Sequence, residues 1–102
     1  MKRFHGNSHQ NSRKHHLYEI WDTEEEDVFK YGISDKPIGE DGLSKRIRDQ
    51  VNLFNRVVNY IRFVGRILVK NIPGRKKAEE LEKETIETYR KKYGRKPRGN
   101  IK

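Results

Sequence analysis

Glu82 stands where an amphipathic helix rarely places a carboxylate. Residues 78–93 show apolar side chains at intervals of three and four, which predicts a helix with one core-facing side. Glu82 falls near the middle of that side at 3.6 residues per turn, whereas most neighbouring glutamates point away. A buried carboxylate costs free energy unless a cation or a hydrogen-bond donor meets it. Two interpretations remain open here: an ion pair with a basic residue, or a metal ligand. The core-facing residues are Ala78, Leu81, Thr85, Ile86, Tyr89 and Tyr93.

Four more polar residues could share chemistry with Glu82. Tyr18 and Tyr31 lie on two predicted strands, Arg46 on a predicted helix, and Asn100 in the basic segment that ends the sequence. Each has a plainer interpretation when it is taken alone. Strand tyrosines commonly pack across a sheet, a helix arginine is commonly solvated, and a Gly-Asn pair commonly forms a turn.

The order of these five residues resembles that of the GIY-YIG nuclease superfamily. Within it, the chain resembles the small nuclease toxin domains at the C-termini of bacterial polymorphic and Rhs-type toxins. The resemblance spans residues 16–100 and departs from the motif in both halves, since His16 and Leu17 replace Gly-Ile and the second half reads Tyr-Gly-Ile. Position 50 is glutamine, where relatives often carry His or Tyr. The matching residues are Tyr18 in HLYEI, Tyr31 in KYGIS, Arg46 in LSKRI, Glu82 in AEELEKETI and Asn100 in PRGN.

The resemblance implies a role for each residue in phosphodiester hydrolysis. That reaction needs an activated water, neutralisation of charge at phosphorus, and help for the departing oxygen. Glu82 would hold one Mg²⁺ or Mn²⁺ ion, and Arg46 would bind the scissile phosphate through its planar guanidinium. Tyr18 would accept or relay the proton of the attacking water, and Tyr31 would orient that water or the phosphate. Asn100 would brace the Glu82 region or the tail by hydrogen bonds.

The elements that must position these residues follow from periodicity. Residues 17–21 and 28–34 alternate as strands of an antiparallel hairpin, with the acidic residues 24–27 exposed at its tip. Ser44 is placed to cap a helix whose inner side includes Ile47 and Val51. A third strand starts near Tyr60, and Gly65 on its apolar side indicates a bulge or a close backbone approach. The turn at residues 71–74 then leads into the Glu82 helix.

This order predicts an α+β fold, a small three-stranded antiparallel sheet packed with two main helices in the order β-β-α-β-α. We expect both helices on one face of the sheet. Residues 1–16 are polar and aperiodic, which indicates a flexible leader or a junction to a larger protein, and residues 17–102 form one domain with a basic C-terminal tail. Of the leader's histidines, His15 and His16 adjoin the first strand and could line its site.

The charge favours a polyanionic partner. The chain holds 24 Lys and Arg against 15 Asp and Glu, a formal charge of +9, so nucleic acid is the expected ligand, DNA in preference to RNA. The absence of cysteine excludes disulfides, thiolate zinc sites and a cysteine nucleophile. No apolar run reaches membrane-spanning length, so we expect a soluble protein without a membrane partner. We also expect a monomer. The expected nucleic-acid contacts are His16, Lys30, Arg62, Arg66, Lys70, Arg75, Lys76 and Lys77.

The resemblance, together with the positive charge, implies a metal-dependent endonuclease, the toxin domain of an interbacterial effector delivered into the cytoplasm of a target cell. An acidic immunity protein would complement the positive charge. Two alternatives stay open. One is a non-catalytic basic module that binds nucleic acid through charge, and the other is a repair or homing-type nuclease of the same superfamily.

Overall fold

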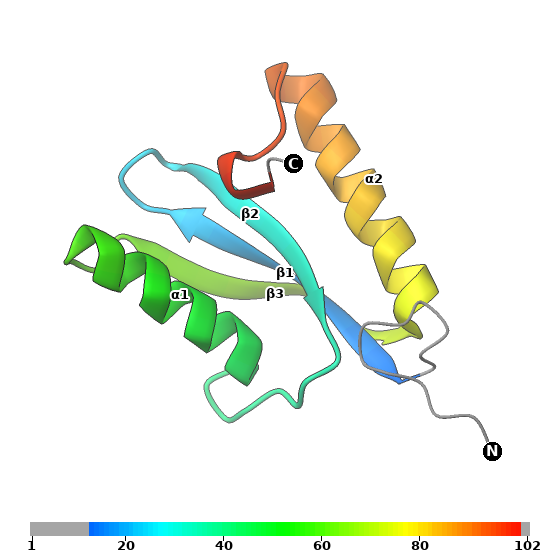
Figure 1. Ribbon diagram of the computed structural model, residues 1–102. Coiled ribbons are helices and arrows are strands. Elements are labelled where there is room, and N and C mark those ends of the chain that lie inside the picture. Colours follow the sequence, from blue (N-terminus) through cyan, green and yellow to red (C-terminus); the bar gives the residue numbers. More distant parts are fainter. Residues whose placement is uncertain (1–12, 101–102) are drawn as a thin grey trace.

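A computed structural model describes residues 13–100 and shows a three-stranded antiparallel sheet with two long helices (Figure 1). This confirms the predicted α+β fold and its β-β-α-β-α order. A short 3₁₀ helix, η1, follows the second long helix. The elements are β1 (Lys14–Asp22), β2 (Asp27–Ser34), α1 (Lys45–Val58), β3 (Phe63–Pro73), α2 (Arg75–Tyr93) and η1 (Arg98–Asn100).

The first strand lies at the centre of the sheet, in the order β2-β1-β3. It pairs antiparallel with both neighbours, so Tyr18 lies opposite Gly32 on one side and Ile67 on the other. The strand begins at Lys14, three residues earlier than predicted, and His15 and His16 are buried in it. The third strand continues through residues 71–73, which were expected to turn. The proposed leader otherwise lies outside the described residues.

The two helices pack on opposite faces of the sheet. Leu17 belongs to a core cluster with Ala78 of α2, whereas the adjacent Tyr18 belongs to a second cluster with Ile47 of α1. Successive residues of a strand point to opposite faces, so these two clusters lie on opposite sides of the sheet. The expectation that both helices share one face is therefore wrong. A central strand buried on both sides still alternates in sequence, and alternation alone does not say which face each helix covers.

Helix α1 lies unusually close to β3. A Cβ atom on Gly65 would come within 2.5 Å of the Ile47 side chain, so the absence of a side chain lets the helix approach. This confirms the close backbone approach predicted at Gly65. Ser44 occupies the N-cap position with extended backbone, as predicted, but its hydroxyl makes no capping hydrogen bond. It lies instead 3.1 Å from Nε2 of His16, joining β1 to the start of the helix.

The segment after α2 folds back along the outer edge of β2 (Figure 1). Pro97 is buried, and Arg95 forms an ion pair of 2.9 Å with Asp27. Asp27 also accepts a hydrogen bond from the Tyr89 hydroxyl. The expectation that Asp27 is exposed at the hairpin tip is therefore wrong. The basic tail is thus docked against the sheet through residue 100.

Asp22 anchors this docking. Its carboxylate is fully buried and accepts hydrogen bonds from Arg62 at 2.8 Å and Arg98 at 2.6 Å. It also accepts the backbone N–H groups of Glu24 and Glu25. The Arg62 guanidinium, with Arg98 and these two amides, holds the pKa of Asp22 well below its usual range although burial opposes this. One carboxylate therefore joins the hairpin turn, the start of β3 and the C-terminal segment.

Across residues 13–100, neither helix is long and apolar enough to cross a membrane.

Candidate functional site

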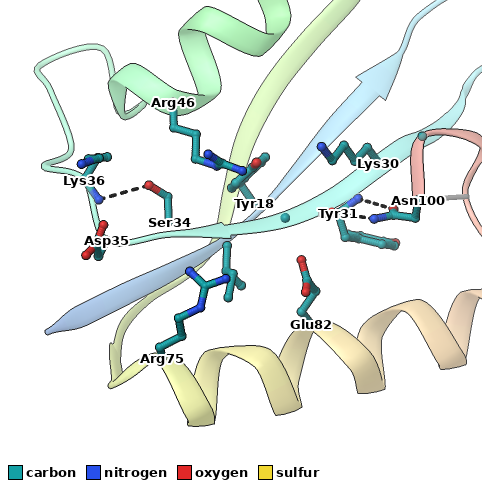
Figure 2. Close-up of a pocket in the computed structure, with 13 residues that line it drawn as sticks. Tyr18, Lys30, Tyr31, Ser34, Asp35, Lys36, Arg46, Arg75, Glu82 and Asn100 are labelled. Atoms are coloured by element: carbon teal, nitrogen blue, oxygen red, sulfur yellow. Dashed lines mark hydrogen bonds between the residues drawn. The ribbon is translucent and has the colours of Figure 1, made fainter. Parts of the chain in front are cut away.

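A cleft of about 440 Å³ at the outer edge of β2 brings together the five residues named from the sequence. Its lining includes Tyr18, Tyr31, Arg46, Glu82 and Asn100. Figure 2 shows Tyr18 and Arg46 on one side of the strand and Glu82 on the other. Because α1 and α2 cover opposite faces, their side chains meet by reaching around this edge strand. The cleft therefore contains groups from both halves of the molecule.

Gly32 makes this meeting geometrically possible. A Cβ atom at Gly32 would lie 2.4 Å from both Cζ and the hydroxyl oxygen of Tyr18. The Tyr18 ring thus lies across the backbone of β2, which brings its hydroxyl from the central strand to the cleft. Sequence reasoning missed this residue. Its only local signal was a glycine inside a strand pattern, which is typical of close approach.

Gln50 fixes the Tyr18 hydroxyl in place. The side-chain nitrogen of Gln50 donates a 3.0 Å hydrogen bond to the Tyr18 oxygen, and the Lys30 ammonium donates a 3.2 Å bond to the Gln50 oxygen. Lysine has no acceptor, so the Gln50 oxygen must face Lys30 and its NH₂ group must face Tyr18. The chain Lys30, Gln50, Tyr18 therefore leaves the phenol one lone pair and its own O–H for a ligand.

Glu82 projects into the cleft from α2 and is half-buried. Burial raises its pKa, an effect opposed by the charges of Arg75, Lys30 and Arg46 and increased by Glu79. Within residues 13–100 its carboxylate accepts no hydrogen bond and forms no ion pair. The salt-bridge interpretation left open by the sequence is thus not what the structure shows. A desolvated carboxylate with cations around it but none in contact is suited to an external cation or donor.

Arg46 reaches the same cleft from the first turn of α1 (Figure 2). Among the described residues its guanidinium makes no hydrogen bond or ion pair, so all of its donors can bind a ligand. Lys30, Lys36 and Arg75 add positive charge to the lining. Arg75 also pairs with Glu79, at 3.1 Å. The cleft thus places several cations around the Glu82 carboxylate, and its second carboxylate, Asp35, is paired with Arg13.

Tyr31 and Asn100 form the end of the cleft. The Asn100 side chain accepts a 2.8 Å hydrogen bond from the Tyr31 N–H and donates a 2.9 Å bond to the Tyr31 carbonyl. Asn100 therefore holds the C-terminal segment against β2 and does not reach towards Glu82. The Tyr31 ring packs edge-on against Tyr89, and burial raises the pKa of its hydroxyl, as do the charges of Glu19, Tyr93 and Asp27. Its hydroxyl stays protonated and can donate.

The other residues expected to contact nucleic acid are distributed unevenly. Lys30 and Arg75 line the cleft. His16 is 3% exposed and bonded to Ser44, so it supports the site from beneath and is not accessible to a ligand. The remaining basic residues of that group lie outside the cleft. Arg62 forms an ion pair with Asp22, and Arg66 forms one with Glu19. The contacts of all five with nucleic acid stay predictions. They are Arg62, Arg66, Lys70, Lys76 and Lys77.

The donor set constrains any metal that this site could hold. Among the described residues, no group of three or more His, Cys, Asp or Glu side chains converges on one point. Glu82 would therefore offer one carboxylate to a metal ion, and the Tyr18 hydroxyl lines the same cleft. One hard oxygen ligand suits Mg²⁺ or Mn²⁺, since Mg²⁺ keeps several of its own waters.

Comparison with known proteins identifies one family. The family model described as URI fold toxin 2 matches residues 8–94. The matched range contains Tyr18, Tyr31, Arg46 and Glu82 and ends before the docked segment that carries Asn100. No curated protein and no solved structure matches the chain.

Proposed function

Since this chain belongs to the URI fold toxin 2 family, we propose that it is a metal-dependent endonuclease of the GIY-YIG type and the toxic part of a bacterial effector. One observation carries this proposal. The guanidinium of Arg46 and the carboxylate of Glu82, neither of which is hydrogen-bonded within residues 13–100, enter one cleft from opposite sides of β2, with the Tyr18 hydroxyl between the two helices that supply them. A phosphate-binding fork, a hard-cation ligand and a proton relay are the groups that phosphodiester hydrolysis requires.

Arg46 would bind the scissile phosphate. Its planar guanidinium can donate two parallel hydrogen bonds to phosphate oxygens, and within residues 13–100 no carboxylate is hydrogen-bonded to it. Lys30 and Arg75 add charge to the same cleft and draw the substrate towards it. Arg46 lies in the first turn of α1, and Ser44 holds that turn to β1 through His16. The start of α1, from which Arg46 extends, is therefore held relative to β1 and Tyr18.

Tyr18 would relay protons during the attack. Gln50 occupies one lone pair of the phenol oxygen, which leaves the second lone pair to take a proton from the attacking water. The phenol passes its own proton to a phosphate oxygen, so the residue ends the step neutral. Hydrogen bonding from Gln50 also stabilises negative charge that develops on the phenol oxygen while the two protons move. Tyr31, held by Asn100, would donate its O–H to the water or the phosphate.

Glu82 would hold the divalent ion. The half-buried carboxylate, which accepts no hydrogen bond from the part of the chain that the structure describes, fits this role, because a bound cation offsets the cost of its desolvation. When bound, such an ion supplies neutralisation of the charge that develops on the phosphorane and activation of a coordinated water. Glu82 and Arg46 would then position the phosphate between the cation site and the guanidinium.

The substrate and partners follow from charge. A formal charge of +9 supports a nucleic-acid substrate, with DNA favoured, and an acidic immunity protein that covers the cleft in the producing cell. A toxin with this activity would act in the cytoplasm of a target bacterial cell, where its substrate is exposed.

A cleavage assay tests this proposal. The full chain should degrade plasmid DNA, or alternatively cellular RNA, in the presence of Mg²⁺ or Mn²⁺ and not in EDTA. Glu82→Gln and Arg46→Ala should each lower the rate by at least about a hundredfold. Matched controls are Glu84→Gln on the solvent side of α2 and Arg56→Ala at the exposed end of α1, which should leave the rate unchanged. Folded wild-type chain that leaves both nucleic acids intact with either metal ion would refute the nuclease assignment.

A further inference from the structure

A second cleft, of about 390 Å³, lies beside the first along the inner side of α2. Tyr31 lines both clefts, so its side chain stands between them. Thr85, which lines the second cleft, comes three residues after Glu82, about 4.5 Å of helical rise. A group held in the second cleft would therefore be the immediate neighbour of a phosphate bound beside Glu82.

Aromatic rings form much of the wall of this second cleft, which we call the aromatic cleft. Trp21, Tyr31, Tyr89 and Tyr93 all line it. Tyr93 is 52% exposed, and its ring rests against Tyr89 with 4.5 Å between centroids. Exposure of this kind is unexpected at a position that the helical repeat assigns to the core. A supported but half-exposed ring offers a flat apolar surface to a planar ligand.

The polar groups of the aromatic cleft are mainly hydrogen-bond acceptors. The Thr85 and Thr88 hydroxyls donate to the helix carbonyls of Leu81 and Glu84, at 2.7 and 2.9 Å, so their oxygens remain able to accept. Glu26 lines the same cleft from the hairpin turn and is exposed there. Apolar walls with a few acceptors match the requirements of a nucleobase that carries amino or ring N–H donors. The Lys92 ammonium, 5.3 Å from the centre of the Tyr93 ring, adds a cation for the sugar-phosphate backbone.

We propose that the aromatic cleft binds the nucleobase next to the scissile phosphate, so that the substrate is a single-stranded or locally unpaired nucleic acid. This inference rests on the proposed function for the position of that phosphate. Bases stack on aromatic side chains with little regard to sequence, which suits a toxin that degrades many sites. A base inside a duplex is already stacked and must leave the helix to enter such a cleft. Paired DNA is therefore cut where it frays or opens.

The single tryptophan of the chain makes this subsite measurable. Trp21 lines the aromatic cleft, so its fluorescence should change when a base enters there. The Glu82→Gln chain in EDTA is titrated with a deoxycytidine pentanucleotide, and separately with an abasic pentanucleotide that has the same number of phosphates. The base-containing strand should quench Trp21 and bind about tenfold more tightly than the abasic strand, in the range of one stacked base.

Two tyrosine variants localise the effect. Tyr93→Ala, made in the same Glu82→Gln background, should remove most of the preference for the base-containing strand. Tyr60→Ala is the matched control, because Tyr60 is similarly exposed at 49% and lines neither cleft. It should leave both affinities and the quenching unchanged.

The outcomes separate the subsite from the proposed function. Equal affinity for the two strands, binding of neither, or a base preference without any change in Trp21 fluorescence overturns the subsite. A base preference that survives Tyr93→Ala overturns it as well. Cleavage by the wild-type chain is measured independently. A base-dependent Trp21 signal in a chain that cleaves nothing supports the subsite and refutes the nuclease. Cleavage together with equal affinities for the two strands supports the nuclease and refutes the subsite.

Discussion

The amide nitrogen of Gln50 donates a hydrogen bond to the hydroxyl oxygen of Tyr18 across 3.0 Å, although the two residues lie 32 positions apart. Lys30 sets the direction of that bond by donating to the Gln50 oxygen. Gln50 is thus an oriented hydrogen-bond donor. It can position Tyr18 without acting as an acid or a base itself. This relationship makes Gln50 a positioning residue whose contribution should be visible in the pH dependence of the reaction.

Replacing Gln50 by glutamate reverses the bond. The new carboxylate accepts from both Lys30 and the Tyr18 hydroxyl, so the phenol proton is held away from the substrate. We expect kcat/KM to fall about a hundredfold, a loss typical of impaired proton transfer, and its pH optimum to move to higher pH. The measurement is a pH profile of kcat/KM for wild type, Gln50→Glu and Gln50→Met. The methionine variant removes the bond without reversing it and should be less impaired, whereas three superimposable profiles would contradict a positioning role.

Gly32→Ala tests whether the Tyr18 ring must lie across β2. The added methyl group would stand 2.4 Å from the Tyr18 ring and hydroxyl, so the ring must move and the site must lose its geometry. We expect a stability loss of about 1–3 kcal/mol and a much larger relative loss of cleavage rate. Gly65→Ala is the comparison, since the nearest atoms to its methyl group belong to Ile47, at 2.5 Å, Val51 and Leu43, and not to Tyr18. Equal residual cleavage rates per folded molecule in the two variants would contradict the requirement that the Tyr18 ring lie across β2.

Glu82→Gln should stabilise the metal-free protein at neutral pH. Burial raises the pKa of Glu82, so the folded state prefers the neutral carboxyl, and ionisation costs stability above the folded pKa. That cost is absent below the ordinary value of 4.5, where the group is protonated in both states. The melting temperature of Glu82→Gln should exceed that of wild type by a few degrees at pH 7 in EDTA and equal it near pH 4. Glu84→Gln should show no such crossover.

Mg²⁺ should reverse that order of stability. A ligand that binds only the folded state adds roughly 1.4 kcal/mol at ten times its Kd. Titration with Mg²⁺ or Mn²⁺ at pH 7 should therefore raise the melting temperature of wild type and leave Glu82→Gln unchanged. This readout does not depend on cleavage. If both proteins respond equally, Glu82 is not the ligand.

Asp22→Asn should weaken the attachment of the C-terminal segment. The change removes a buried charge from between Arg62 and Arg98, and breaking a buried pair costs about 3 kcal/mol. The depressed pKa of Asp22 contributes stability above its ordinary value of 3.8, which is lost as the pH falls through the lower folded pKa. Urea denaturation at pH 7 and at pH 3 should show the deficit shrinking at the lower pH. Asp49→Asn, in an exposed pair with Lys45, should cost at most about 0.5 kcal/mol.

Much of the fold was accessible from sequence because it depends on local periodicity, whereas the membership of the cleft came from the resemblance of five residues to one nuclease superfamily. The repeat of three and four around Glu82 predicted that this carboxylate points inwards, and the alternation around Tyr18 and Tyr31 predicted the hairpin. These signals span only a few turns or a few strand residues. They report which side of an element is buried and carry no information on which neighbour covers it.

The features that sequence reasoning missed are long-range. The buried cluster of Asp22, Arg62 and Arg98 joins residues 40 and 76 positions apart, and its members looked like a solvated turn and a basic tail. The close passage of Tyr18 over Gly32 depends on two strands being in register. The placement of α1 and α2 on opposite faces depends on a central strand that is buried on both sides. Each of these is a property of packing between elements.

The division of the interior into two small cores has a consequence for heat inactivation. Arg46 rests on the core shared with α1 and Glu82 on the core shared with α2, and the sheet alone joins them. Cooperative units of this size can open separately, with free energies below that of global unfolding. A small tilt of either helix would then disassemble the cleft while most backbone hydrogen bonds survive. We therefore expect cleavage activity to be lost at a temperature several degrees below that at which the circular dichroism signal is lost. A cleavage assay would then detect heat inactivation of this protein earlier than circular dichroism.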